Sequence, residues 1–205
     1  MKRVVICNVP MKPQVEKTVY LSNDKSLPSS CDPYLYPVNS FLSQIINTKD
    51  QLKVLLLVKK DGRNNSAVNV QKFKDEMESF CIPLAIEPVY SIIYTDFSQE
   101  KTVHTQLMGR IIDEIDDESQ IVADITYGPK DLPIVVFSAL FFAENYLNCS
   151  IDNILYGQAL FDGNNVIKAS LCDMTSLYYL SSLSNTITCK DPIKARQMIS
   201  SLLDL

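Results

Sequence analysis

The sequence predicts an α/β fold of the doubly wound kind, in which a mainly parallel sheet carries an antiparallel hairpin late in the chain. Short apolar runs alternate with longer segments whose apolar residues recur at helical spacing. The runs at residues 4–7 and 52–58 are apolar at nearly every position, as expected of strands buried on both faces of a parallel sheet. The chain has 205 residues, 46% of them apolar, which is enough for one core. We expect a single domain over residues 1–205, with the hairpin and a C-terminal helix from about residue 158 onwards.

The expected elements follow one another along the chain. Strands are expected at residues 2–9, 52–58, 84–89, 121–125 and 151–156, the third of them extended through 90–94 or followed there by a second short piece. A hairpin is expected over residues 160–167, with Asp-Gly-Asn-Asn at its tip. Helices are expected at residues 39–47, 68–80, 98–115, 133–147, within 171–183 and at 191–205, the last with Met198, Ile199, Leu202 and Leu203 facing inward. Residues 10–37 contain five prolines and read as a long loop, which is either a functional segment or a mobile flap.

The helix expected at residues 133–147 is apolar on nearly all sides. A helix of this kind is buried on more than one side, either between the sheet and another domain or at a two-fold interface. We therefore expect a homodimer with this helix at or near the interface.

Composition excludes several classes of protein. The net charge of −5 and the pI of about 4.9 disfavour a protein that binds duplex nucleic acid through its phosphates. No run approaches the ~18 apolar residues of a membrane span, and the start of the chain lacks a signal-peptide layout. Six scattered cysteines are typical of reduced core thiols in a cytoplasmic protein. We expect no membrane partner and a cytoplasmic location.

The motifs of common cofactors are also absent from the sequence. The first strand is followed by Asn-Val-Pro-Met-Lys and not by Gly-x-Gly-x-x-Gly, which argues against a nicotinamide or flavin enzyme. There is no Walker lysine motif, no nucleophile elbow and no His-Glu pair, so we expect neither a cofactor nor a metal. The acidic run at residues 113–118 reads as a solvated helix end, and His104 as a surface or edge-packed residue.

The candidate ligand site is the turn between the strand at 121–125 and the helix at 133–147. Gly128 lets a ligand approach the backbone, Thr126 and Tyr127 supply hydroxyls, and Lys130 supplies a cation beside the N–H groups at the helix start. A plain strand-to-helix connection is the simpler alternative. In a doubly wound sheet, ligands bind beyond the C-terminal ends of the strands. The turns at residues 8–17, 59–65 and 126–131 should therefore share one edge.

Two of these turns supply the candidate ligand-binding residues. They are Asn8, Val9, Pro10, Met11, Lys12, Thr126, Tyr127, Gly128, Pro129, Lys130 and Asp131.

The segment Asp-Ile-Thr-Tyr-Gly-Pro-Lys-Asp-Leu-Pro at residues 124–133, with Ile-Leu-Tyr-Gly at 154–157, resembles the CRISPR-associated Rossmann-fold (CARF) sensor domains. The family pattern is Asp-hydrophobic-Thr-His-Gly-hydrophobic-Arg-x-hydrophobic-Pro. In this chain Tyr127 replaces the histidine, and Pro129 and Lys130 stand where a hydrophobic residue and arginine are common. The resemblance implies a Rossmann-like homodimer that binds cyclic oligoadenylate, most commonly the tetra-adenylate, across its two-fold axis in type III CRISPR antiviral defence.

Two other functions are compatible with the sequence. Some members of the family are ring nucleases, which cleave cyclic oligoadenylate without a metal by attack of a ribose 2′-hydroxyl on the neighbouring phosphate. In such an enzyme, Thr126 or Tyr127 would orient the hydroxyl or contact the phosphate, and Lys130 or Lys12 would offset charge on it. The other alternative is an unrelated Rossmann-like protein that binds a small anion.

Overall fold

A computed structural model describes the whole chain except residues 14, 25–26, 29, 61–64, 97, 99, 164, 187 and 204–205. The strands are β1 (Lys2–Asn8), β2 (Tyr20–Leu21), β3 (Gln51–Lys59), β4 (Val89–Thr95), β5 (Gln120–Asp124), β6 (Ser150–Asp162) and β7 (Asn165–Asp173). The helices are α1 (Pro37–Ile45), α2 (Asn65–Cys81), α3 (Lys101–Glu114), α4 (Asp131–Tyr146), α5 (Thr175–Thr186) and α6 (Pro192–Leu203), with a 3₁₀ turn at Ile82–Leu84.

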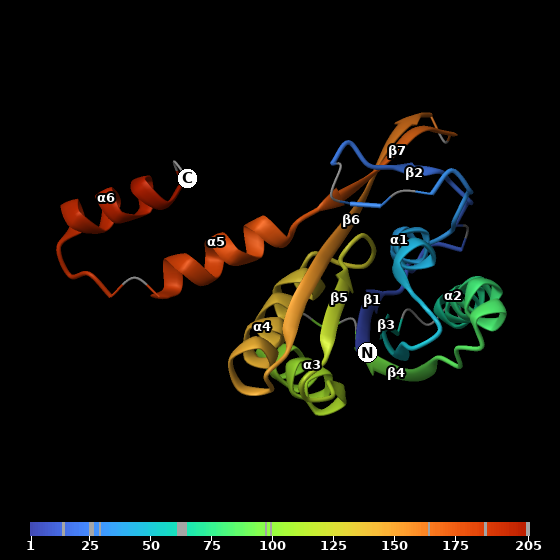
Figure 1. Cartoon of the computed structure of the whole chain (residues 1–205), viewed down its shortest axis with the longest axis horizontal. Helices are drawn as coiled ribbons and strands as arrows, with labels where there is room; N and C mark the ends of the chain where they lie inside the picture. Colours follow the sequence, from blue (N-terminus) through green and yellow to red (C-terminus); the bar gives the residue numbers. More distant parts are fainter. Residues whose placement is uncertain are drawn as a thin grey trace.

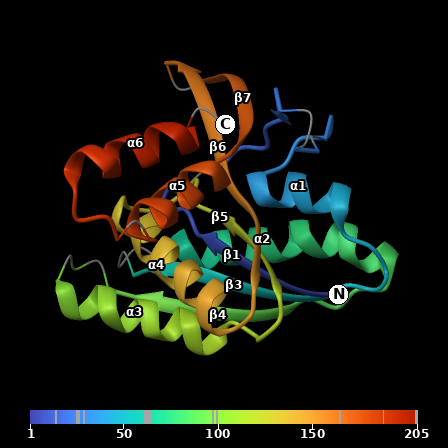
Figure 2. The ribbon, with the colours of Figure 1, turned by 60° about the vertical axis from the view of Figure 1, so that its left-hand side comes forward.

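The predicted fold class is confirmed. The seven strands form one sheet in the order β2-β7-β6-β5-β1-β3-β4, and all neighbours are parallel except the β6–β7 pair. Helices α1 and α2 cover one face of the sheet, and α3 and α4 cover the other (Figures 1 and 2). Alternate residues of β1 enter the two cores, because side chains of a strand point to opposite faces: Val5 packs with α1 and α2, and Ile6 with α3 and α4.

The expected third strand at residues 84–89 is wrong. Residues 82–84 form a 3₁₀ turn that continues α2, and Ala85 adopts a left-handed conformation (φ 55°) that ends it. The backbone N–H of Ile86 then donates to the carbonyl of Cys81, a bond typical of a helix C-terminus. The strand lies at Val89–Thr95, within which the expected extension falls. A short apolar run has the same composition in a helix end and in a strand, so the sequence did not separate them.

The strand at 151–156 and the expected hairpin are one continuous structure. β6 continues through Gly157 to Asp162 and pairs antiparallel with β7 over residues 155–162. A short strand, β2, also lies within the expected loop at residues 10–37 and pairs with Ala169 and Ser170 of β7. We call residues 10–36 the strap. The tip residue 164 lies outside the described residues.

A buried carboxylate on α2 holds the strap to the helices that cover one face of the sheet. Glu76 accepts hydrogen bonds from the backbone N–H of Leu35 (2.7 Å) and Tyr36 (3.2 Å) and from the amide of Asn39 (3.0 Å). Burial raises the pKa of Glu76, and these hydrogen bonds oppose the rise. Within the strap, Thr18 and Tyr34 exchange backbone hydrogen bonds at 2.9 Å. The end of the strap and the start of α1 therefore have one fixed position.

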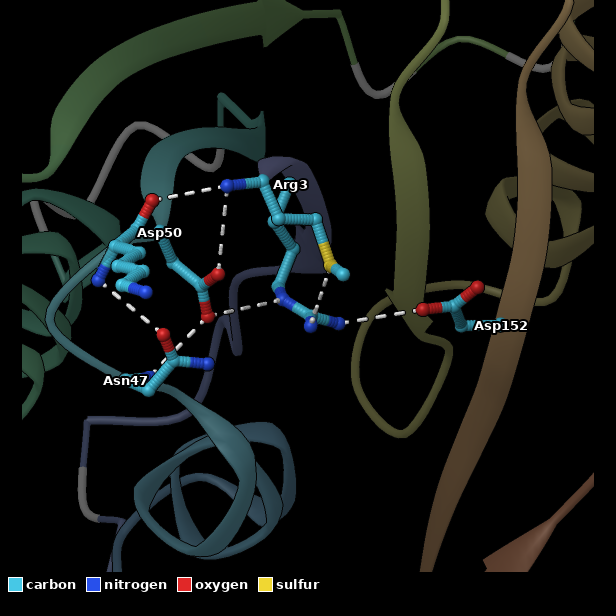
Figure 3. Close-up of polar contacts among 6 residues, drawn as sticks. Arg3, Asn47, Asp50 and Asp152 are labelled. Atoms are coloured by element: carbon cyan, nitrogen blue, oxygen red, sulfur yellow. Dashed lines mark hydrogen bonds and ion pairs between the residues drawn. The ribbon is translucent and has the colours of Figure 1, made fainter.

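A second polar cluster lies near the N-terminal end of β1 and joins neighbouring parts of the sheet (Figure 3). Arg3 lies with its Nη1 3.3 Å from Oδ2 of Asp152 on β6 and its Nε 4.0 Å from Oδ2 of Asp50, just before β3. Asp50 also accepts the backbone N–H of Asn47 at 3.2 Å. Because Arg3 stands near the N-terminal end of β1, the cluster lies at the edge opposite the C-terminal strand ends. It ties three strands together and has no place in the ligand site.

The C-terminal helices extend away from the sandwich (Figure 1). The first turns of α5 pack on α4: the rings of Tyr178 and Phe137 lie 5.8 Å apart, and the Tyr178 hydroxyl donates to Glu144 at 2.7 Å. The expectation that Met198 faces inward is wrong, since its exposed fraction is 47% on the projecting α6. Ile199 is half-buried, and the side chains of Leu202 and Leu203 lie outside the description.

Helix α4 is buried on its sheet side and partly covered by α3 and α5. Ile134 and Tyr146 have exposed fractions of 69% and 71%. The apolar residues that predicted burial on more than one side thus leave an uncovered face on one copy of the chain. Among the described helices, none has the length and apolar content needed to cross a bilayer.

Candidate functional site

The candidate site lies where the C-terminal ends of β1 and β5 meet. After the short edge strand β2, the chain continues through β3 and β4 on one side of β1, whereas β5 and β6 lie on the other side. This change of direction makes the β1–β5 edge the topological switch point, where the connecting segments diverge and leave room for a ligand. The residues that follow β1 and β5 are the two turns that the sequence analysis selected.

Asn8, at the end of β1, has the most unusual environment in this region. Its exposed fraction is 0%, and neither its Oδ1 nor its Nδ2 has a hydrogen-bond partner among the described residues. A buried amide without partners costs about 1–3 kcal/mol. It lies against the β5–α4 turn, because a Cβ built on Gly128 would come within 3.6 Å of the Asn8 Cβ. A polar group of this kind is expected where a ligand completes the site.

The turn after β5 needs glycine at position 128. The backbone φ there is +88°, a region that other residues rarely adopt, and an added Cβ would lie 2.8 Å from Cδ1 of Leu132. Gly128 is exposed, and α4 begins three residues later. The turn thus leaves its backbone open to an incoming group. Substitution at Gly128 would disturb the turn itself, so it cannot isolate a ligand contact.

Thr126 and Asp124 connect the turn to neighbouring elements. The Thr126 hydroxyl accepts the backbone N–H of Gly157 at 2.7 Å, which joins the turn to β6. Asp124 accepts the N–H of Thr126 (2.8 Å) and of Val38 in the first turn of α1 (3.1 Å). Burial raises the pKa of the Asp124 carboxyl to about 6, although hydrogen bonds from Thr126 and Val38 oppose the shift. The Thr126 hydroxyl therefore has a structural partner.

Gly157 has a packing role in the same arrangement. A Cβ at this position would lie 2.4 Å from Cγ of Pro37 and 3.2 Å from Cε1 of Tyr20. Only glycine lets α1 and the strap approach β6 this closely. The Tyr-Gly pair at 156–157 contributed to the family resemblance. In the structure, its glycine allows close packing of Pro37 and Tyr20 on β6.

Tyr127 points into the protein and not toward a ligand. Its hydroxyl donates to the carbonyl of Leu35 at 3.0 Å and lies 3.5 Å from the hydroxyl of Tyr20. Its ring packs edge-on against Tyr36, with centroids 5.9 Å apart. Burial is the main cause that raises the pKa of Tyr127, so the phenol stays neutral at physiological pH. The side chain fastens the strap over the turn.

The segment after β1 is fixed by a residue that the sequence analysis did not select. The amide of Asn69 on α2, which is fully buried, donates to the carbonyls of Pro10 and Lys12 at 2.8 Å each. Val9 and Pro10 are buried, Met11 is half-buried and the Lys12 side chain is exposed. Of the residues predicted here, only Asn8 and Lys12 offer polar side chains to the edge.

Charge at the edge is arranged differently from the expectation. Lys59 was expected in the turn at residues 59–65, but it ends β3 with a side chain 1% exposed and its Nζ 3.0 Å from Oδ2 of Asp131. His104 Nε2 lies 3.3 Å from the same oxygen, so this edge-packed histidine belongs to a charged cluster. Arg63 and the rest of 61–64 lie outside the described residues. Lys130 has an exposed side chain in the turn.

Among the described residues, this edge coincides neither with a metal site nor with the cavity beside the strap. Within the described part of the chain, no three His, Cys, Asp or Glu side chains converge in a way that could hold a metal ion. A cavity of about 400 Å³ lies between the strap and β7, lined by residues 16–19 and 166–169. It is open, and its lining side chains include none of the buried unpartnered groups. We therefore place the candidate site at Asn8.

The residues that support the site could not be found by sequence alone. Asn69, Glu76, Lys59 and His104 lie far along the chain from the turns they hold, and no motif marks them. Comparison with known proteins adds no relative, since no family model matches the chain and no curated protein matches it significantly.

Proposed function

We propose that this protein binds cyclic oligoadenylate at the β1–β5 edge, as a homodimeric sensor of the CARF kind in type III CRISPR antiviral defence. The observation that carries the proposal is the buried amide of Asn8, which has no hydrogen-bond partner among the described residues and lies beside the open turn at Gly128. An amide can donate to and accept from the edge of an adenine at the same time. The start of α4 and the exposed Lys130 supply the N–H groups and the cation that a phosphate needs.

Sensing is favoured over cleavage by the contacts of the two candidate hydroxyls. The Thr126 hydroxyl accepts a hydrogen bond from the backbone N–H of Gly157, and the Tyr127 hydroxyl donates one to the carbonyl of Leu35. Both hydroxyls therefore already have protein partners and are not oriented toward a ribose or phosphate group. A ring nuclease would need these contacts to rearrange. Incubation of stoichiometric protein with cyclic tetra- and hexa-adenylate in EDTA, followed by separation of the products, decides between the two. We expect the ring to stay intact for hours.

Binding itself is tested by titration of the protein with cyclic tetra-adenylate. We expect a submicromolar Kd, and weaker binding of linear oligoadenylate and ATP, which lack the preorganised ring. Equal affinity for the cyclic and linear forms would contradict a ring sensor and favour a general anion site.

Lys130→Ala should weaken binding of cyclic tetra-adenylate by about 1–3 kcal/mol, because a charge-assisted hydrogen bond to phosphate is lost. Its side chain is exposed, so the fold should be unaffected. Lys190→Ala, on the projecting C-terminal segment, removes an equally exposed cation and should leave the Kd unchanged. The proposed contact is wrong if both variants bind as the parent does.

The protein should sediment as a homodimer at micromolar concentration. The uncovered face of α4 (Ile134, Tyr146) and the exposed Leu177 on α5 give the apolar surface that a second copy would cover. Analytical ultracentrifugation with and without cyclic tetra-adenylate measures this. A monomer under both conditions contradicts the two-fold arrangement.

A further inference from the structure

A buried ion pair lies directly behind the proposed phosphate site. Lys59 ends β3, and its ammonium donates to the carbonyl of Asp96 at 3.0 Å and lies 3.0 Å from Oδ2 of Asp131. The Asp131 side chain is 9% exposed, and His104 approaches it from α3 at 3.3 Å. The three side chains come from β3, α3 and α4. The contacts proposed for the ligand at Asn8, Lys130 and the N–H groups of α4 do not include these three side chains.

The position of Asp131 poses an electrostatic problem for an anion site. Asp131 is the first residue of α4 and follows Lys130 directly. A carboxylate in the first turn stabilises a helix, but it also opposes a second anion at the same N-terminus. Two like charges about 7 Å apart, at an effective dielectric constant near 20, repel strongly enough to weaken binding by roughly tenfold or more. The site can accept phosphate only if this charge is offset.

We infer that Lys59 sets the anion affinity of the β5–α4 turn by neutralising Asp131, so that the pair determines specificity without touching the ligand. The inference rests on the proposed anion site, beside which the buried amide of Asn8 lies without a hydrogen-bond partner among the described residues. Lys59 and Asp131 together carry no net charge. His104 adds a further positive charge to the cluster only when it is protonated.

The test is a set of three variants, Lys59→Met, Asp131→Asn and the double variant, at pH 8 and low salt. Methionine keeps the apolar length of lysine, and asparagine keeps the shape of aspartate. We expect Lys59→Met to weaken anion binding roughly tenfold or more, Asp131→Asn to tighten it several-fold, and the double variant to lie within about threefold of the parent. If the cluster only held the fold together, both single changes would weaken binding and the double variant would not recover.

Two controls keep the outcome clear. Lys59→Arg retains the charge, so its affinity for the anion should be closer to that of the parent than the affinity of Lys59→Met is. Lys60→Met removes the neighbouring exposed cation, whose ion-pair partner is Asp96 at 3.7 Å, and should change the affinity less than twofold. If Lys59→Met does not fold, Asp131→Asn still decides: unchanged or weaker binding overturns the inference.

Two probes separate this inference from the proposed function. Inorganic pyrophosphate, titrated while the amide resonances of Gly128 and Lys130 are followed, reports on the anion site alone. Cyclic tetra-adenylate, titrated by calorimetry, reports on the sensor function. If pyrophosphate shows the expected order of variants and the ring does not bind, the charge inference stands and the sensor proposal falls. If the ring binds but the variants do not follow this order, only the inference falls. A parent that binds neither anion overturns both.

Discussion

Replacing Asn8 with leucine should make the free protein more stable and weaken binding of cyclic tetra-adenylate at least tenfold. The Asn8 amide is fully buried and has no hydrogen-bond partner among the described residues, so it carries a desolvation cost of about 1–3 kcal/mol. Leucine has nearly the same shape and no polar atom, so about 1 kcal/mol or more should be recovered. The ligand would then lose the hydrogen bonds that the amide offers, and we expect at least a tenfold increase in Kd. Urea unfolding and calorimetric titration measure the two effects.

Asn39→Leu is the matched control. Asn39 is also fully buried, but its amide donates to Glu76 at 3.0 Å. Leucine there should destabilise the protein by about 1–3 kcal/mol, because a buried carboxylate loses a donor. Opposite signs for the two asparagines would show that Asn8 is kept for a ligand. The role proposed for Asn8 is wrong if Asn8→Leu destabilises the free protein as much as Asn39→Leu does.

The stability of the protein should fall as pH rises from about 4 to about 6, through the buried carboxyl of Asp124. Its pKa is raised from 3.8 to about 6, mainly by burial. In this pH range the folded protein keeps a proton that the unfolded chain has released, so the free energy of unfolding decreases with pH. The stabilisation is complete below pH 4 and is lost above pH 6. A shift of about two pKa units corresponds to roughly 3 kcal/mol.

Asp124→Asn removes this titration and should flatten the profile between pH 4 and 6. Burial raises the pKa of Glu76 as well, so a smaller slope of the same sign should remain in the variant. Chemical denaturation at half-unit pH intervals compares the two proteins. Identical profiles would show that Asp124 does not carry the pH dependence. Other groups also titrate in this range, so the difference between the proteins is the quantity to use.

Local pattern was sufficient for most of the elements but not for their exact limits. β1 and β3 were predictable because a parallel strand that is buried on both faces must be apolar at nearly every position. The strand at residues 84–89 was mispredicted because the end of α2 has the same apolar composition. β2 could not be predicted, because it has only two residues and a segment this short shows no periodicity of apolar residues.

The sequence by itself determined the α/β class, the mainly parallel sheet and the edge at which the turns after β1 and β5 meet. These features follow from rules that act along the chain, namely the periodicity of apolar residues, the residues favoured in turns and the right-handed crossover between parallel strands. The tertiary structure alone decided what each side chain at that edge does. It turned Tyr127 inward to the strap, buried Lys59 against Asp131 and left the Asn8 amide without a hydrogen-bond partner in the described part of the chain. Such roles depend on which distant groups come within hydrogen-bond distance, and that is fixed only when the helices and the strap pack on the sheet.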